Sequence, residues 1–418
     1  MLNIIKSDDI PRVSEQRILH LVLRWLHHGK VRLGFTKLLF ENVRFGLLPL
    51  DTLRTLYTQT DIPLTASIKC MIIKAINYHS IPSKQPLLQG KYSTMRNQKG
   101  WIMLVGGTSS GGLVDNILGF DVYSHRWRRV TTLHLKVQHH CICVIGNFLY
   151  VIGGETLERS SDGTKESSLC VTNVVYRYDP RFDQWVQVSS MLQKRAQFSC
   201  CIIDNYIFAI GGRADQQTLL SSVEFYDINR DTWTTAKELP CKMHGQASAV
   251  HNNTIYISGG KREALVNSSK DVYSFNRLES QWKKQAPMTI ARFGHKMATV
   301  RDVIFTFLGI YEPFSDIEKY DPNSNQWTRL RPLPFDRFCY GLVVVEQTVL
   351  LLGGKKWQDS QEVPTQNIVG YDTENDCWEE ICSMAVPLSG LQCSILHLPD
   401  TTETDEKLPN LYSIKTTV

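Results

Sequence analysis

The chain has 418 residues, of which 42% are hydrophobic and 21% are charged, and its formal net charge is +5. A composition so close to the globular average excludes a disordered chain, and the mild charge argues against a nucleic-acid-binding protein. No apolar run approaches the roughly 20 residues that a membrane-spanning helix needs, so we expect no membrane partner.

The N-terminus and the cysteines indicate the cellular compartment of the protein. The N-terminus turns acidic at Asp8 and Asp9, which is untypical of a secretory signal. Eleven cysteines without a CxxC spacing favour reduced thiols over a disulfide framework. These features predict a cytoplasmic, or else nuclear, protein.

Residues 1–79 are predicted to form a small all-α domain. Ser14 is placed to cap a helix whose apolar residues recur at helical spacing, and Asp51 is placed to cap a later one. Two further helices are expected, one from about Phe35 to near Pro49 and one over 64–78. Residues 80–100 are polar, contain two prolines and are predicted to be a linker.

The second part of the chain repeats. The pattern [FY]-[DN]-x5-W occurs six times, ending at Trp127, Trp185, Trp233, Trp282, Trp327 and Trp378. Glycine pairs stand before five of these units: Gly106-Gly107, Gly153-Gly154, Gly211-Gly212, Gly259-Gly260 and Gly353-Gly354. The fifth unit lacks the pair and has Gly309 followed by Ile310. Six matches at fixed internal spacing are a true repeat.

Each repeat predicts four short strands, which is typical of a propeller blade. An apolar run such as YIFAIGG precedes the glycines, a second run lies upstream, and two more strands flank the turn between the aromatic residue and the tryptophan. The aromatic side chains are expected between blades, and the Asp or Asn is expected to cap the turn. The first blade starts abruptly at Trp101, so we expect residues 389–399 to complete it and close a six-bladed propeller over 101–399. Residues 400–418 are predicted to be a flexible tail.

This repeat resembles the Kelch repeat. The N-terminal run RWLHHGKVRLGFTKLLFENVRFGLLP resembles the BACK domain that precedes Kelch repeats, through Trp25, Leu38, Leu39, Val43-Arg44 and Leu47-Leu48-Pro49. Together they resemble the Kelch-like family of substrate adaptors for cullin-RING ubiquitin ligases. Family members usually begin with a BTB domain that holds the cullin and dimerises; none is recognised in this sequence, which suggests a shortened isoform or a fragment.

The resemblance implies a protein-interaction module and not an enzyme, with no cofactor and no metal. A target protein or peptide would bind the propeller, and the cullin would be a second partner. Two alternatives stay open: a cytoskeletal scaffold that binds actin, and an enzyme that uses polar groups at the ring centre.

Basic residues recur where the resemblance places loops around one mouth of the channel. Some follow the glycine pairs and others precede the first strand of a blade, and together they are Arg195, Arg213, Lys261, Arg262, Arg292, Arg337 and Lys355. Converging guanidinium groups suit an acidic peptide; solvated loop charges, or arginines that brace the blades, are the alternative. Phe198, Phe293, Phe338 and Tyr340 are either contact anchors or packing residues.

Three other features carry weaker hypotheses. The polar insert 155–173 is predicted to be a flexible loop. Ser109 lies in a G-x-S-x-G pattern, but no helix is expected after it, which argues against a catalytic serine. His139-His140 with Cys141 and Cys143 are attributed to packing, because alternate strand residues point to opposite faces.

Overall fold

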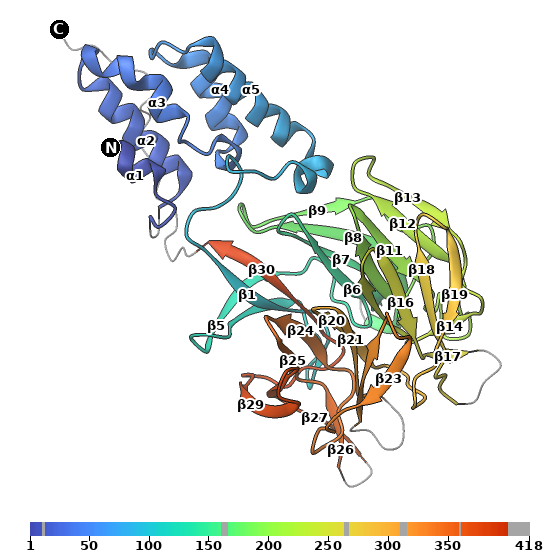
Figure 1. Ribbon diagram of the computed structural model, residues 1–418. Coiled ribbons are helices and arrows are strands. Elements are labelled where there is room, and N and C mark those ends of the chain that lie inside the picture. Colours follow the sequence, from blue (N-terminus) through green and yellow to red (C-terminus); the bar gives the residue numbers. More distant parts are fainter. Residues whose placement is uncertain (11–12, 160–165, 263–266, 310–315, 359–360, 400–418) are drawn as a thin grey trace. The chain divides into compact units, whose positions relative to one another are not determined.

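The structure is a computed structural model that describes residues 1–10, 13–159, 166–262, 267–309, 316–358 and 361–399. The chain divides into a helical unit, mainly Met1–Gly100, and a β unit over Trp101–Tyr178 and Trp185–Leu396 (Figure 1). The predicted tail 400–418 lies outside the described residues.

Short helices build the helical unit around one apolar core. The α-helices are α1 (Leu2–Lys6), α2 (Glu15–His27), α3 (Thr36–Phe40), α4 (Leu50–Gln59) and α5 (Ala66–Ser80), and the 3-10 helices are η1 (Lys30–Phe35), η2 (Phe45–Leu47) and η3 (Pro82–Leu87). Ser14 caps α2 as predicted, because its Oγ accepts a hydrogen bond from the Arg17 amide at 3.3 Å. Apolar side chains of α2, α4 and α5, among them Val22, Leu53 and Ile72, are fully buried together.

Two helix predictions need correction. Asp51 lies in the first turn of α4 and is not its cap, because the Leu53 amide already bonds to the carbonyl of Pro49. The helix expected to run from Phe35 to near Pro49 ends at Phe40. The backbone beyond it is bound elsewhere, since the Asn42 carbonyl accepts from Arg96 and the Arg44 amide donates to Glu15.

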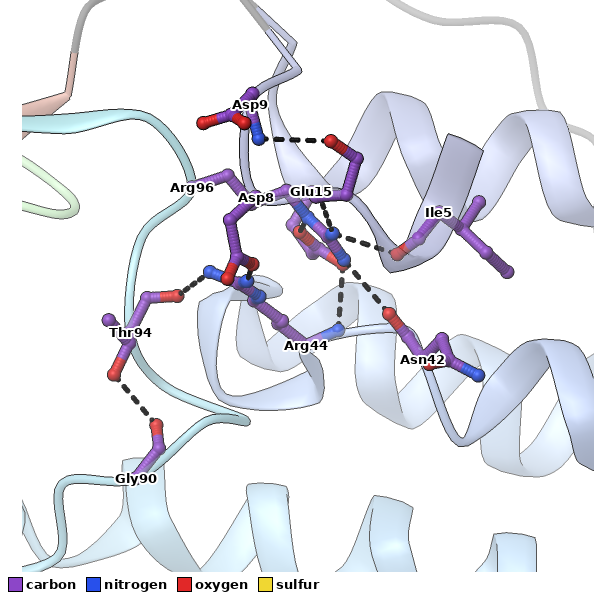
Figure 2. A network of polar contacts seen from close by, with 10 residues as sticks. Ile5, Asp8, Asp9, Glu15, Asn42, Arg44, Gly90, Thr94 and Arg96 are labelled. Atoms are coloured by element: carbon purple, nitrogen blue, oxygen red, sulfur yellow. Dashed lines mark hydrogen bonds and ion pairs between the residues drawn. The ribbon is translucent and has the colours of Figure 1, made fainter. Parts of the chain in front are cut away.

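The predicted linker 80–100 is folded against the helices for most of its length. Arg96 donates two hydrogen bonds to the Glu15 carboxylate, at 2.8 and 3.0 Å, and others to the carbonyls of Ile5, Ser7 and Asn42 (Figure 2). The side chains of Arg96 and Glu15 are only 4% and 2% exposed. This buried, fully bonded pair fixes the segment onto the start of α2, so the segment is not a free spacer.

The β unit consists of six four-stranded antiparallel sheets within the described residues, the blades of a propeller. Blade 1 contains β30 (Gln392–Pro399), β1 (Gln98–Val105), β4 (Asn116–Asp121) and β5 (Arg126–Thr132); blade 2 contains β6 (Cys141–Ile145), β7 (Phe148–Arg159), β8 (Glu166–Asp179) and β9 (Gln184–Val188); blade 3 contains β10 (Ser199–Ile203), β11 (Tyr206–Ile210), β12 (Val223–Asp227) and β13 (Thr232–Ala236). Blade 4 contains β15 (Ala247–His251), β16 (Thr254–Ser258), β18 (Val272–Asn276) and β19 (Gln281–Gln285); blade 5 contains β20 (Lys296–Val300), β21 (Val303–Phe307), β22 (Ile317–Asp321) and β23 (Gln326–Arg329); blade 6 contains β24 (Gly341–Val345), β25 (Thr348–Leu352), β28 (Asn367–Asp372) and β29 (Cys377–Ser383).

The first strand listed for each blade lies at the axis, where β6, β10, β15, β20 and β24 contact one another in series. The predicted closure is confirmed, because the C-terminal strand β30 hydrogen-bonds to β1 and takes the axial place in blade 1 (Figure 1). Where the structure describes the chain between strands, it also forms three separate two-stranded ribbons: β2 (Thr108–Ser109) with β3 (Gly112–Leu113), β14 (Met243–His244) with β17 (Lys261–Arg262), and β26 (Lys355–Gln358) with β27 (Gln361–Pro364).

The repeated tryptophans join each blade to the one before it. The indole N–H groups of blades 3 to 6 donate to carbonyls at the outer end of the preceding blade; these pairs are Trp233 to Ser189, Trp282 to Lys237, Trp327 to Ala286 and Trp378 to Arg331. In blade 2, Trp185 donates to the Thr131 hydroxyl. The Tyr or Phe of each motif is buried, whereas of the six tryptophans only Trp233 falls below one tenth exposure. The aromatic positions are therefore inter-blade contacts, as predicted.

The acidic or amide residue of the motif caps the turn in every blade. For example, Asp227 accepts from the Asn229 amide at 2.9 Å, and Asn276 accepts from the Leu278 amide at 2.9 Å. Blades 2 and 3 are also joined by a chain of hydrogen bonds through Asp231, a residue that the repeat motif does not specify. The Tyr226 hydroxyl donates to Asp231, and the same Asp231 oxygen accepts the Ser189 amide of the neighbouring blade.

We expect Trp233→Ala to lower the free energy of unfolding of the propeller by about 3–5 kcal/mol, because it removes a buried aromatic side chain. Trp233 is 7% exposed, lies 5.3 Å from the Tyr226 ring and bonds to Ser189 at 2.8 Å. Chemical denaturation measures the loss. Trp233→Phe is the matched control, which keeps an aromatic ring and should lose only about 1 kcal/mol with the hydrogen bond. Equal stability of wild type and Trp233→Ala would contradict this placement.

The glycine pairs are required by close backbone approach. Gly212 has φ +93°, and a Cβ there would lie 2.5 Å from the Cβ of Phe198. In blade 5 the pair is replaced by Leu308-Gly309, with φ +43° and +118°. Gly309 therefore keeps the second position, where a Cβ would lie 2.9 Å from the Phe293 carbonyl oxygen, and Leu308 adopts the left-handed backbone at the first. Leu308 is fully buried among the apolar residues between blades 5 and 6.

The insert 155–173 was expected to be a loop, and this is wrong for most of its length. Strands β7 and β8 continue into it as a two-stranded ribbon, with Glu155 opposite Val171 and Leu157 opposite Leu169. Alternating β-branched and apolar residues such as Val171 and Leu169 let the pairing extend beyond the blade. Residues 160–165, at its tip, lie outside the described residues.

Candidate partner-binding site at the mouth of the propeller channel

A ring of backbone groups surrounds one mouth of the central channel. Each axial strand is preceded by a residue with positive φ, and these six residues, here named the belt, are His139, Gln197, Gly245, Gly294, Cys339 and Gly390. Neighbours in the belt are linked by hydrogen bonds from one amide to the next carbonyl. Four such bonds measure 2.7 to 3.0 Å: Gln197 to His139, Gly245 to Gln197, Gly294 to Gly245 and Gly390 to Cys339. The belt gives the mouth a rigid rim.

A second ring of side chains lies beside the belt. The residue that follows a glycine pair forms a backbone β-bridge with the residue that precedes a belt position. The five described residues of this kind are named the outer ring: Thr108, Glu155, Arg213, Lys261 and Lys355. The fold thus brings Arg213, Lys261 and Lys355 together from three blades. Arg262 follows Lys261 on the same strand, and its guanidinium bonds to Asp271 at 2.6 Å.

The outer ring is predominantly cationic. Arg213 pairs with Glu155, and Lys355 pairs with Glu362 at 2.8 Å. The Lys261 ammonium lies 4.9 Å from the centre of the Phe293 ring. Burial, together with the nearby charges of Arg213 and Lys261, lowers the pKa of His244 to about 4. Burial is the largest cause of this shift, and the charges of Arg213 and Lys261 add to it by disfavouring a further cation in the mouth.

Arg195, Arg292 and Arg337 are not part of the mouth surface, which corrects the prediction. Their exposures are 0%, 0% and 1%. Arg195 bonds to the Glu224 carboxylate at 2.7 Å and to the carbonyls of Gly211 and Ser222. Arg292 repeats this arrangement with Glu318 at 2.9 Å and with two carbonyls of its own blade. Arg195 and Arg292 thus brace the loops that enter blades 3 and 5, which is the alternative that the sequence left open.

Arg337 shows the same bracing, but no buried carboxylate of the described residues pairs with it. It donates to the carbonyls of Leu351 and Asn367 at 3.2 and 3.1 Å. Glu224 and Glu318 stand two residues before the motif tyrosine, but blade 6 has Val369 there. Burial without a close carboxylate lowers the pKa of Arg337 to about 10.

Of the four aromatic candidates, Phe293 alone is exposed enough to be a contact anchor. Phe198, Phe338 and Tyr340 are 6%, 2% and 1% exposed, so they are packing residues. Phe293 is half-buried and lies 5.0 Å from the His244 ring.

A cavity lies behind the belt, and no sequence motif points to it. Its volume is about 110 Å³, and its lining includes all six belt residues together with Lys296 and Gln392. Lys296 and Gln392 each lie two residues after a belt residue, at the first position of an axial strand. This spacing is the sequence signal that could have placed their side chains near the axis.

Comparison with known proteins matches both parts of the chain. The KLHDC2/KLHL20/DRC7 Kelch-repeats domain matches residues 138–354 and 197–395, and the domain described as BTB And C-terminal Kelch matches residues 1–58. Human Kelch-like protein 34 is 44% identical over 95% of this chain and 69% of its own length. The chain belongs to the Kelch-like family.

Other Kelch-like relatives are more distant. Bovine Kelch-like protein 36 is 29% identical and human Kelch-like protein 15 is 26% identical, each over 96% of this chain and over 66% and 69% of their own lengths. The chain thus spans about two thirds of the length of these relatives. Among the described residues, no helix of this Kelch-like chain is long and apolar enough to cross a membrane.

Proposed function

We propose that this Kelch-like propeller binds an acidic segment of a target protein at its channel mouth and serves as the substrate adaptor of a cullin-RING ubiquitin ligase. The observation that carries the proposal is the outer ring, in which Arg213, Lys261 and Lys355 converge from three blades onto a rigid backbone rim. Loops held on a rigid scaffold are the usual place for binding residues. Membership of the Kelch-like family, with a BACK match beside the repeats, supports the adaptor role.

The proposed activity is binding of a target protein and not catalysis. The proposed location is the cytoplasm. The basic residues that remain candidates for target contact are Arg213, Lys261, Arg262 and Lys355. Arg262 is the weakest of them, because Asp271 already neutralises it. Cullin recruitment would involve the helical unit.

Charge reversal at Arg213, Lys261 and Lys355 together should weaken target capture at least about tenfold, roughly 1.4 kcal/mol, through lost electrostatic complementarity. Proximity labelling in cells, comparing wild type with the triple variant, would identify the proteins whose capture depends on the mouth. Cullin pull-down from the same cells tests the adaptor role.

The matched control reverses three exposed charges at the outer ends of blades: Arg126, Lys237 and Lys283. This control variant changes the net charge by the same amount as the mouth variant, at positions away from the axis. It should therefore capture the target as well as the wild type does. Wild-type capture by the mouth variant, or equal losses in both variants, would refute binding at the mouth.

A further inference from the structure

The cavity behind the belt contains an unusual charged group. Lys296 is the first residue of axial strand β20, and its ammonium bonds to the Gln392 Oε1 at 2.8 Å. Lys296 belongs to blade 5 and Gln392 to blade 1, so this bond spans blade 6. The equivalent position in blade 6 is Gly341, which has no side chain to block the way.

Lys296 has a polar partner but no acidic one. In the ranges that the structure describes, no carboxylate forms an ion pair with it, and the ionisable groups that influence it most are the thiols of Cys141, Cys393 and Cys339. Burial lowers the pKa of the Lys296 ammonium. A desolvated ammonium bonded to a neutral amide is a poorly compensated charge, and a carboxylate is the group that would compensate it.

The belt lies close to more basic than acidic side chains. Burial is the largest cause of the lowered pKa of His139; Glu155 opposes the shift, and the positive charges of Arg213, Lys296 and Lys355 add to it. A cavity of about 110 Å³ is smaller than the roughly 150 Å³ void that accommodates benzene, and it is large enough for an acetate-sized head group.

We propose that this cavity binds one carboxylate of the target protein, either an acidic side chain or a chain terminus, through an ion pair with Lys296. The inference rests on the proposed function, since it assigns a specific ligand group to the mouth. The carboxylate enters through the belt and replaces or joins Gln392 as the acceptor of the ammonium. The outer ring supplies long-range attraction, and Lys296 supplies the short-range contact.

The first test places the ligand group inside the chain. Gln392→Glu is nearly isosteric and sets a carboxylate against Lys296, so we expect the melting temperature of the propeller to rise by about 2 °C or more. In a Lys296→Met background the same substitution should lower it, because the carboxylate is then unpaired. Gln281→Glu, on outer strand β19, is the exposed control. If Gln392→Glu has the same effect with and without Lys296, the ammonium does not seek a carboxylate and the proposal fails.

The second test uses two pairs of short peptides as probes. One pair is a glycine tripeptide with a free or an amidated C-terminus, and the other is a capped peptide with a central glutamate or glutamine. Titration of the full chain is followed by NMR of the 13C-methyl group of Met297, the neighbour of Lys296. The carboxylate member of at least one pair should bind about tenfold or more tightly than its amide, as expected for a charged hydrogen bond.

The pair that shows this preference identifies the source of the carboxylate. Lys296→Met and Gln392→Glu should both abolish the preference, and Lys356→Met, which removes a lysine next to the outer ring, should keep it. Equal binding of acid and amide in both pairs, or a preference that survives Lys296→Met, would overturn the carboxylate site. That result leaves the adaptor proposal standing if reversal of Arg213, Lys261 and Lys355 still abolishes target capture.

Discussion

Replacement of Arg292 by Met is expected to destabilise the propeller by about 3–5 kcal/mol, because it leaves a buried carboxylate without its partner. Arg292 and Glu318 are both fully buried and lie 2.9 Å apart. The same guanidinium also bonds to the carbonyls of Leu308 and Asp316 at 2.9 and 2.8 Å. Equilibrium unfolding in denaturant, followed by tryptophan fluorescence, measures the effect.

Two variants separate this explanation from a general loss of positive charge. Arg292→Met combined with Glu318→Leu removes both ions and should recover part of the stability, although the Thr289 amide loses its acceptor. Arg126→Met removes an exposed arginine at the start of β5 and should change stability by less than about 1 kcal/mol. If Arg292→Met were as stable as Arg126→Met, the bracing role would be disproved.

The bracing role also changes how a binding experiment must be designed. Charge reversal at Arg195, Arg292 and Arg337 would place three buried acidic groups beside carbonyls and carboxylates. Lost target capture in such a variant would report unfolding. The mouth is therefore tested at Arg213, Lys261 and Lys355, with the melting temperature of that variant measured alongside, because Arg213 pairs with the buried Glu155.

A chain truncated after Leu388 is expected to have no cooperatively folded propeller. The truncation removes β30, which is the axial strand of blade 1, and exposes the edge of β1. It also removes Leu391, Leu396 and Leu398, which are at most 1% exposed. At about 1.5–3 kcal/mol for each buried side chain, their loss approaches the total stability of an ordinary domain.

Circular dichroism during thermal unfolding would show this as the loss of the sharp transition. A chain truncated after Pro399 is the control, because it keeps every strand that the structure describes. If the chain ending at Leu388 melted as sharply as the control, closure by β30 would be unnecessary to the ring.

The sequence by itself determined the repeat architecture. Each blade carries its own aromatic residue, turn-capping Asp or Asn, and tryptophan at fixed spacing, so the strands, the number of blades and the closing strand follow from local pattern. The Asp227 turn and the Trp233 contact lie where that pattern places them, because both depend on residues close in sequence or one repeat away.

Only the tertiary structure decided which basic residues lie at the mouth and which are buried inside a blade. Arg195 is fully buried against Glu224 of its own blade, whereas Arg213 pairs with Glu155 of the neighbouring blade beside the belt. The position of each guanidinium depends on which carboxylate it meets in the fold, and no spacing along the chain reports that meeting. Lys296 was missed for the same reason, since its partner Gln392 is 96 residues away and reaches it only when the ring closes.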